Sequence, residues 1–199
     1  MKEIIFSMVL STIAFTACNS SNDKPGVSQN KTESDRSAIK PQTNDTTAPN
    51  KEAKTTVSIK EIVNTYLQLK NAFAKDNTSE AASAGTALQS AFENFDTTAL
   101  SGAQKKIFED IADDAKEHGE HIGKNGGNIK HQREHFEMLT GDIYDLVKTF
   151  GAGQVLYKDF CPMYNNGKGA YWISETKEIK NPYLGKAMPT CGTVKEEIR

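Results

Sequence analysis

Four sulfur-bearing side chains lie in two short segments near the C-terminal end of the sequence: Cys161 and Met163 in one, Met188 and Cys191 in the other. Thiolate and thioether sulfurs are soft donors, which bind Cu(I), Ag(I) and similar ions in preference to magnesium or calcium. Proline and glycine stand beside the cysteines and favour tight turns, in which two side chains of one segment can converge. Together the segments can offer up to four sulfur ligands to one soft ion.

The same cysteines can instead form a disulfide. The chain has three cysteines, and only two remain if Cys18 carries a lipid, as the N-terminal sequence indicates below. Cysteine pairs in the oxidising cell envelope commonly oxidise, and a Cys161–Cys191 bridge would stabilise the fold by about 3 to 4 kcal/mol. In that alternative Met163 and Met188 fill the core. Spacing alone favours the disulfide over the metal site.

The four histidines form two pairs that can supply nitrogen ligands. His118 and His121 are three residues apart, and His131 and His135 are four apart, so each pair can share one helical face. Imidazole can complete a mixed sulfur and nitrogen site. The apolar pattern nevertheless predicts His118 as a hydrogen-bonded core residue, and His121 and His131 on a solvated face. For His135, at the border of the predicted core, a ligand role and a structural role are evenly balanced.

No enzyme signature accompanies these residues. The sequence contains no Gly-x-Ser-x-Gly turn, no phosphate-binding glycine loop and no His-Glu-x-x-His motif. The formal net charge is -2, and charges of both signs are interspersed along the chain, which argues against a nucleic-acid surface. We therefore expect a protein that is not an enzyme and does not bind nucleic acid.

The N-terminal residues predict export and lipidation. Lys2 precedes an uncharged apolar run, Ile4 to Phe15, which is too short to span a bilayer as a helix but suits a secretory signal peptide. Two small residues then precede Cys18, although Phe15 stands where a lipobox usually has a leucine-like residue. We predict a signal peptide at residues 1–17 and a lipid anchor on Cys18. The alternative is an ordinary signal peptide followed by a chance cysteine.

Residues 18–56 predict a disordered tether, because they are rich in Ser, Thr, Asn, Asp, Lys, Gln and Pro and contain no aromatic residue. Residues 57–199 have the length of one ordinary domain. No other apolar run approaches membrane-spanning length. We therefore expect a cell-envelope protein that is lipid-anchored to the inner or outer membrane, with its domain facing the periplasm or the cell surface.

Four segments of the domain show apolar residues at three- and four-residue steps, the pattern of amphipathic helices. They run from about residue 59 to 73, 82 to 92, 107 to 122 and 129 to 150. Ser101 begins a capping box before the third segment. The apolar stripe of that segment is predicted to consist of Ile107, Ile111, Ala115, His118 and Ile122. Four such segments with short connections predict an antiparallel four-helix bundle.

The helical period ends at about Gly151, and a different pattern follows. Residues 155–157 and 170–173 predict two short strands on either side of a turn at 165–169. The residues beyond them are rich in turn formers, aromatics and sulfur, which is typical of an irregular segment that packs on a scaffold and carries function. The predicted fold is mainly α: an antiparallel four-helix bundle, then a short β-hairpin and an irregular sulfur-rich C-terminal tail.

A succession of motifs in this half of the chain resembles a known family. The motifs are HQREHF at 131–136, CPMYN at 161–165, GKGAYWIS at 167–174, EIKNPYLG at 178–185, and finally Met188 and Cys191-Gly192. They resemble the bacterial domain-of-unknown-function family 3347. That family is found in lipoproteins of Bacteroidetes-type bacteria and attached to the periplasmic adaptor subunits of copper- and silver-efflux pumps. The resemblance runs from about Ile59 to Val194, and the Cys-Pro-Met element is also similar to heavy-metal-binding modules of copper-transport proteins.

The resemblance implies heavy-metal handling. Its motifs fall on the candidate ligands His131, His135, Cys161, Met163, Met188 and Cys191. With it, we expect the lipoprotein to bind Cu(I) or a similar soft ion, and to buffer the ion in the periplasm or pass it to an efflux adaptor. One departure is Phe160, which stands just before the Cys-Pro-Met element, where many relatives carry a polar residue or histidine. The alternative is a disulfide-stabilised interaction module that docks another envelope protein through Trp172 and Tyr183.

Overall fold

The computed structural model describes residues 58–199. The predicted signal peptide at 1–17, the lipidation of Cys18 and the predicted tether at 18–56 lie outside the described residues. The described part is mainly helical, with four α-helices followed by a three-stranded antiparallel sheet. The helices are α1 (Lys60–Ala74), α2 (Thr78–Glu93), α3 (Gly102–Lys124) and α4 (Ile129–Phe150). None of these helices combines the length and apolar character needed to cross a membrane.

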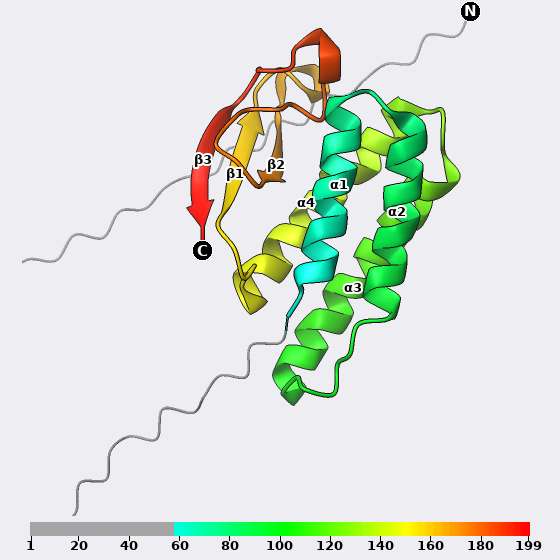
Figure 1. The fold of residues 1–199 in the computed structure, drawn as a ribbon, viewed down its shortest axis with the longest axis vertical. Coiled ribbons are helices and arrows are strands. Elements are labelled where there is room, and N and C mark those ends of the chain that lie inside the picture. The colour runs from blue at the N-terminus through cyan, green and yellow to red at the C-terminus, as the bar shows by residue number, and fades with distance from the viewer. Residues whose placement is uncertain (1–57) are drawn as a thin grey trace, which may run out of the picture. The chain divides into compact units, whose positions relative to one another are not determined.

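Successive helices run in opposite directions, as the colour gradient in Figure 1 shows, and side-chain caps fix where three of them begin. The side chains of Asn77 and Asn128 accept from backbone N–H groups in the first turns of α2 and α4. Ser101 and Gln104 form the predicted capping box of α3. Each cap satisfies an N–H that has no partner within its helix. The helical bundle is therefore encoded largely by local signals.

Aromatic rings dominate the core between the helices. Phe136 of α4 stacks on Tyr66 of α1 with ring centroids 5.3 Å apart. On α3, however, the buried face differs from the predicted stripe: Phe108 is buried, whereas Ile107 is 42% exposed. The aromatic ring of Phe108 packs 4.2 Å from that of Phe95. Burying the larger ring removes more apolar surface from water, so the helix turns Phe108 rather than Ile107 toward the core.

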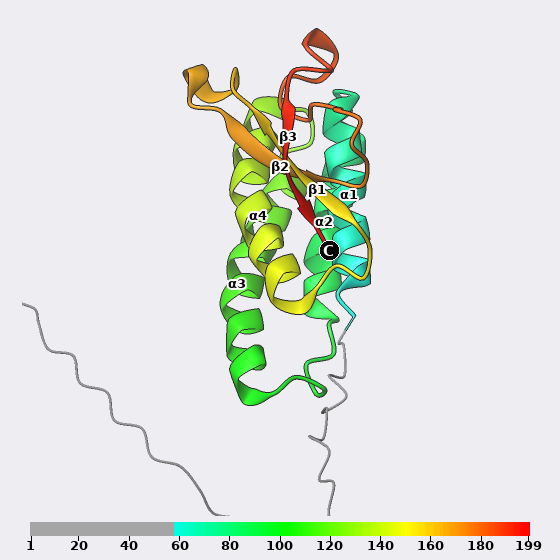
Figure 2. The ribbon, with the colours of Figure 1, turned by 90° about the vertical axis from the view of Figure 1, so that its left-hand side faces the viewer.

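The sheet comprises β1 (Leu156–Cys161), β2 (Ala170–Ser174) and β3 (Thr193–Ile198) in the order β2-β1-β3. Both outer strands are antiparallel to β1. The sheet covers the side of the bundle formed by α1 and α4, with β2 in contact with both helices (Figures 1 and 2). The sequence pattern does not predict β3, because this edge strand is charged and mostly exposed.

Two buried cations hold the segment between β2 and β3 on the bundle. The Lys70 ammonium of α1, 1% exposed, lies 2.7 Å from the carboxylate of Glu175. Arg133 of α4 donates to the carbonyl of Pro182 at 2.7 Å and to the carboxylate of Asp76 at 2.6 Å. Both cations are therefore paired and hydrogen-bonded, as buried charges must be. These contacts hold the segment that carries Met188 and Cys191 against the bundle.

Candidate functional site

The structure brings the two C-terminal cysteines together at one end of the sheet. Cys161 is the last residue of β1, and Phe160 pairs with Thr193 of β3, which follows Cys191 by two residues. The two Sγ atoms lie 3.6 Å apart, and both cysteines are free thiols. This separation is well beyond an S–S bond of about 2.0 Å. Cys161 is buried, whereas Cys191 is partly exposed, so the pair is open to solvent on one side.

Asn181 and Gly192 shape the loop that carries Cys191. The Asn181 side chain is fully buried, donates to the carbonyl of Cys191, and accepts from the N–H groups of Tyr183 and Leu184 at 2.8 and 2.9 Å. A Cβ atom at Gly192 would lie only 2.6 Å from the ring of Trp172. Glycine is therefore needed for the close approach of this loop to the buried tryptophan.

The two methionines predicted as ligands flank this pair through their backbone. The N–H of Met163 donates toward the Cys191 sulfur, and the N–H of Cys191 donates to the carbonyl of Met188 at 3.2 Å. The side chains of Met163 and Met188 are 58% and 43% exposed. Burial, followed by the neighbouring Cys161, raises the pKa of the Cys191 thiol. Binding of a metal would therefore release a proton from this thiol.

Within residues 58–199, no histidine, aspartate or glutamate completes a ligand group of three with the two thiols. The geometry of α4 explains why. Arg133 faces the C-terminal segment through its bond to Pro182. At about 100° per residue, His131 and His135 point roughly 160° away from Arg133. The predicted sulfur and nitrogen ligands therefore form two separate groups.

The histidines gather with one another instead, across the α3–α4 turn. Nitrogen atoms of His121, His131 and His135 all lie within 4.8 Å of one another. The rings of His121 and His135 stack with centroids 4.3 Å apart. The Nδ1 atoms of His118 and His135 lie 3.2 Å apart, within hydrogen-bond distance. Two helices thus contribute two imidazoles each to one cluster.

Burial and mutual proximity keep part of this cluster neutral. Burial, and then the neighbouring His121, His131 and His118, lowers the pKa of His135 to about 4. Burial also lowers the pKa of His118. Neutral imidazole is the form that binds metal ions. Carboxylates surround the rings: those of Glu117, Glu134 and Asp142 lie 3.9, 3.6 and 4.0 Å from His121, His131 and His118.

The position of these histidines about the turn explains their convergence. His121 and His131 each lie five residues from Gly126, and His118 and His135 lie eight and nine residues from it. In an antiparallel helix pair, residues equally far from the turn lie at the same level. The spacing of histidines within each helix does not show that the two pairs lie at the same level. Their nearly equal distances from the glycines between the two predicted helices do indicate it.

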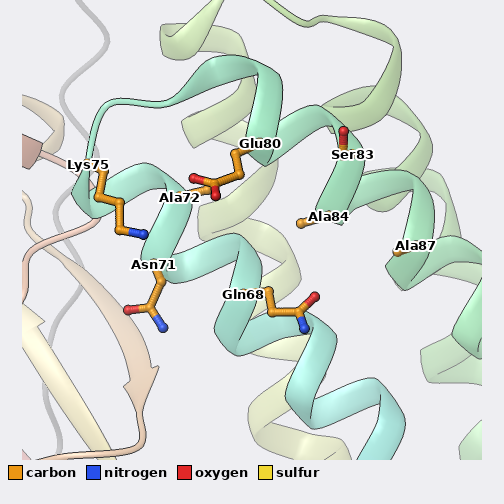
Figure 3. A pocket seen from close by; sticks show the side chains of 8 residues that line it. All are labelled: Gln68, Asn71, Ala72, Lys75, Glu80, Ser83, Ala84 and Ala87. Carbon is orange, nitrogen blue, oxygen red and sulfur yellow. The ribbon is translucent and has the colours of Figure 1, made fainter.

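A groove between α1 and α2 is a poorer candidate (Figure 3). Eight side chains line it, and none of them is a cysteine, methionine or histidine. They are Gln68, Asn71, Ala72, Lys75, Glu80, Ser83, Ala84 and Ala87. Small and polar groups of this kind offer no soft donor. The two candidate sites are therefore the thiol pair and the histidine cluster.

Comparison with known proteins bears on the helical part. Neither the curated proteins nor the solved structures contain a match to this chain. One family matches over residues 62–155, which include most of α1, all of α2 to α4 and every histidine, and which end before β1 and the thiols. The match supports placing this region of the chain in the domain family described as "Protein of unknown function (DUF3347)".

Proposed function

We propose that this protein binds a soft metal ion such as Cu(I) or Ag(I) through the thiolates of Cys161 and Cys191. The observation that carries the proposal is the 3.6 Å separation of the two free Sγ atoms. Two sulfurs that each bind one ion at about 2.3 Å, the zinc–thiolate distance, are at most about 4.6 Å apart. The thiols therefore fit a shared ion without a change of backbone. Soft sulfur ligands select Cu(I) over magnesium or calcium.

The surroundings of the thiols favour binding over simple burial. Cys191 is partly exposed, which gives an ion a path to the pair. The exposed side chains of Met163 and Met188 follow and precede the cysteines and can supply thioether sulfur to the same ion. Proteins that pass an ion to a partner must hold it near the surface. An accessible pair of thiolates beside two exposed thioethers meets that requirement.

The biological setting of the proposal comes from the sequence. In it Cys18 carries a lipid that anchors the chain to an envelope membrane, and the domain buffers the ion in the periplasm or delivers it to a heavy-metal efflux adaptor. The family resemblance and the lipobox-like N-terminus support this setting. Protein that stays in the membrane fraction of cells, and that a Cys18→Ser substitution releases, would support the anchor.

The metal proposal is tested by competition for Cu(I) with a chromophoric chelator. The reduced mature chain, starting at residue 18 with Cys18→Ser, is compared with the same chain carrying Cys161→Ser and Cys191→Ser. We expect one Cu(I) per chain and an affinity loss of about 100-fold or more in the double variant, because both strong ligands are gone. A Met163→Leu/Met188→Leu variant is the matched control, and it measures what the thioethers add.

Two outcomes would overturn the metal proposal. Equal Cu(I) affinity with and without the two cysteines would place the metal elsewhere. Absence of free thiols in denatured, unreduced protein isolated from the envelope would favour the disulfide-stabilised interaction module instead, because a disulfide sulfur is not a thiolate donor. Thermal unfolding of each variant checks that the substitutions at buried Cys161 leave the domain folded.

A further inference from the structure

We infer that His121, His131 and His135 form a second metal site, separate from the thiols, which binds a borderline divalent cation such as Cu(II), Ni(II) or Zn(II). The three residues offer nitrogen atoms within 4.8 Å of one another. Imidazole nitrogen suits these ions, whereas magnesium and calcium prefer oxygen. The site shares no residue with the thiol pair. The histidine site can therefore be tested independently of the proposed soft-metal function.

The distances leave room for one ion at the centre of the cluster. A bound ion keeps each nitrogen at about 2.0–2.1 Å, which places tetrahedral ligands about 3.3 Å from one another. Small rotations of the rings bring nitrogens from within 4.8 Å to that separation. His121 and His131 are 44% and 34% exposed, so these rings have the freedom to turn and an ion can enter from solvent.

His118 acts in this site as a positioning residue. Its Nδ1 lies 3.2 Å from Nδ1 of His135, and its Nε2 lies 4.0 Å from the carboxylate of Asp142. If His135 donates its Nδ1–H to His118, the lone pair on Nε2 of His135 is free for the metal. His118 then carries its proton on Nε2, which faces Asp142. Metal-binding histidines commonly donate their second N–H to such a partner.

Asp142 supports this arrangement independently. Its Oδ2 atom is buried and has no hydrogen-bond partner among the described residues. A buried acceptor without a partner is costly, and native structures rarely leave one without a reason. The nearest donor of the cluster is Nε2–H of His118, 4.0 Å away. A small shift of His118 when the ion binds would close this gap and fix the tautomer of both rings.

The geometry also predicts a consequence for stability. His121 belongs to α3, whereas His131 and His135 belong to α4, so a bound ion links the two helices across their turn. Binding to the folded state alone raises the unfolding temperature as the ion concentration rises. We therefore expect Zn(II) to raise the unfolding temperature of the domain. Magnesium and calcium are expected to leave it unchanged.

The test uses the mature chain with Cys18→Ser, Cys161→Ser and Cys191→Ser, so that no thiol can bind the probe. Titration with Zn(II), Ni(II) and Cu(II) is expected to give one ion per chain. The double substitution His121→Gln/His131→Gln should weaken binding by about 100-fold or more. Losing a residue that only hydrogen-bonds to a ligand typically costs roughly 10- to 100-fold. The same double substitution should abolish the Zn(II)-induced rise in unfolding temperature. The matched control replaces Lys124→Gln and Lys130→Gln, exposed residues on either side of the same turn.

His118 has its own test, because a merely structural residue would change stability rather than affinity. We expect His118→Leu to weaken Zn(II) binding by about tenfold with little change in the metal-free unfolding temperature. His118→Gln, which keeps an acceptor for His135, should restore part of the affinity. Equal affinity in the histidine variants and the lysine control would overturn the site. Absence of binding by this cysteine-free chain would also overturn it, while leaving the soft-metal proposal intact.

Discussion

Asn181 offers a direct test of how the thiol pair is held in place. We predict that Asn181→Ala destabilises the domain and separates the two sulfurs. The side chain is fully buried and makes three hydrogen bonds: to the carbonyl of Cys191 and from the N–H groups of Tyr183 and Leu184. Alanine leaves all three backbone groups without these partners. At about 1 kcal/mol for each bond, the free energy of unfolding should fall by about 3 kcal/mol.

The measurement is urea denaturation of the reduced chain at neutral pH. Asn94→Ala is the matched control, because Asn94 is exposed and makes a single side-chain bond to the carbonyl of Ser90. We expect the control to lose less than about 1 kcal/mol. The Cu(I) affinity of Asn181→Ala should also fall, by about tenfold, because the Cys191 loop is no longer tied down. Equal stability losses in the two variants would refute the role given to Asn181.

Two further predictions concern the bundle. Glu175→Gln should cost about 3 kcal/mol because it leaves the buried Lys70 ammonium without its anionic partner, whereas adding Lys70→Met to that variant should recover much of the loss. Burial lowers the pKa of Lys70, and Glu175 opposes that shift. Without Glu175 the folded state therefore binds fewer protons at Lys70 than the unfolded state does, so the free energy of unfolding of Glu175→Gln should rise from pH 7 to 9.5. A urea-denaturation stability that does not change with pH over this range would contradict the prediction. Phe108→Ala should cost about 3 kcal/mol or more and Ile107→Ala less than about 1 kcal/mol; the reverse order in urea denaturation would place Ile107 in the core.

The helices could be predicted because their signals are local. Apolar residues at helical spacing and the capping box at Ser101 act within one or two turns, and the structure confirms the four helices and this cap. The register of α3 and the strand β3 could not be predicted in the same way. Phe108 is buried because Phe95, from a different part of the chain, provides a surface for its ring. β3 exists because β1 offers an edge, since its own sequence is charged.

The candidate sites show the same division between local and distant information. The pairing of β1 with β3 brings Cys161 and Cys191 together. The spacing of residues in the sequence does not predict that pairing. The sequence motif around His131 and His135 marks both residues as candidate ligands. It cannot show that Arg133, between them, occupies the face that meets the C-terminal segment. The histidines must then face α3.

Separation of the two sites has a chemical consequence. Copper is stable as Cu(I) with thiolates and as Cu(II) with imidazoles, and the two donor sets here lie in groups that share no residue. A domain with both sites would bind copper in either oxidation state, each at its own ligands. The Cu(I) capacity of the reduced chain should then depend on Cys161 and Cys191 alone. The Cu(II) capacity, measured in the cysteine-free chain because Cu(II) oxidises thiols, should depend on His121 and His131 alone. Loss of both capacities from either pair would mean that the ions share ligands, which this structure does not permit without a rearrangement of α4.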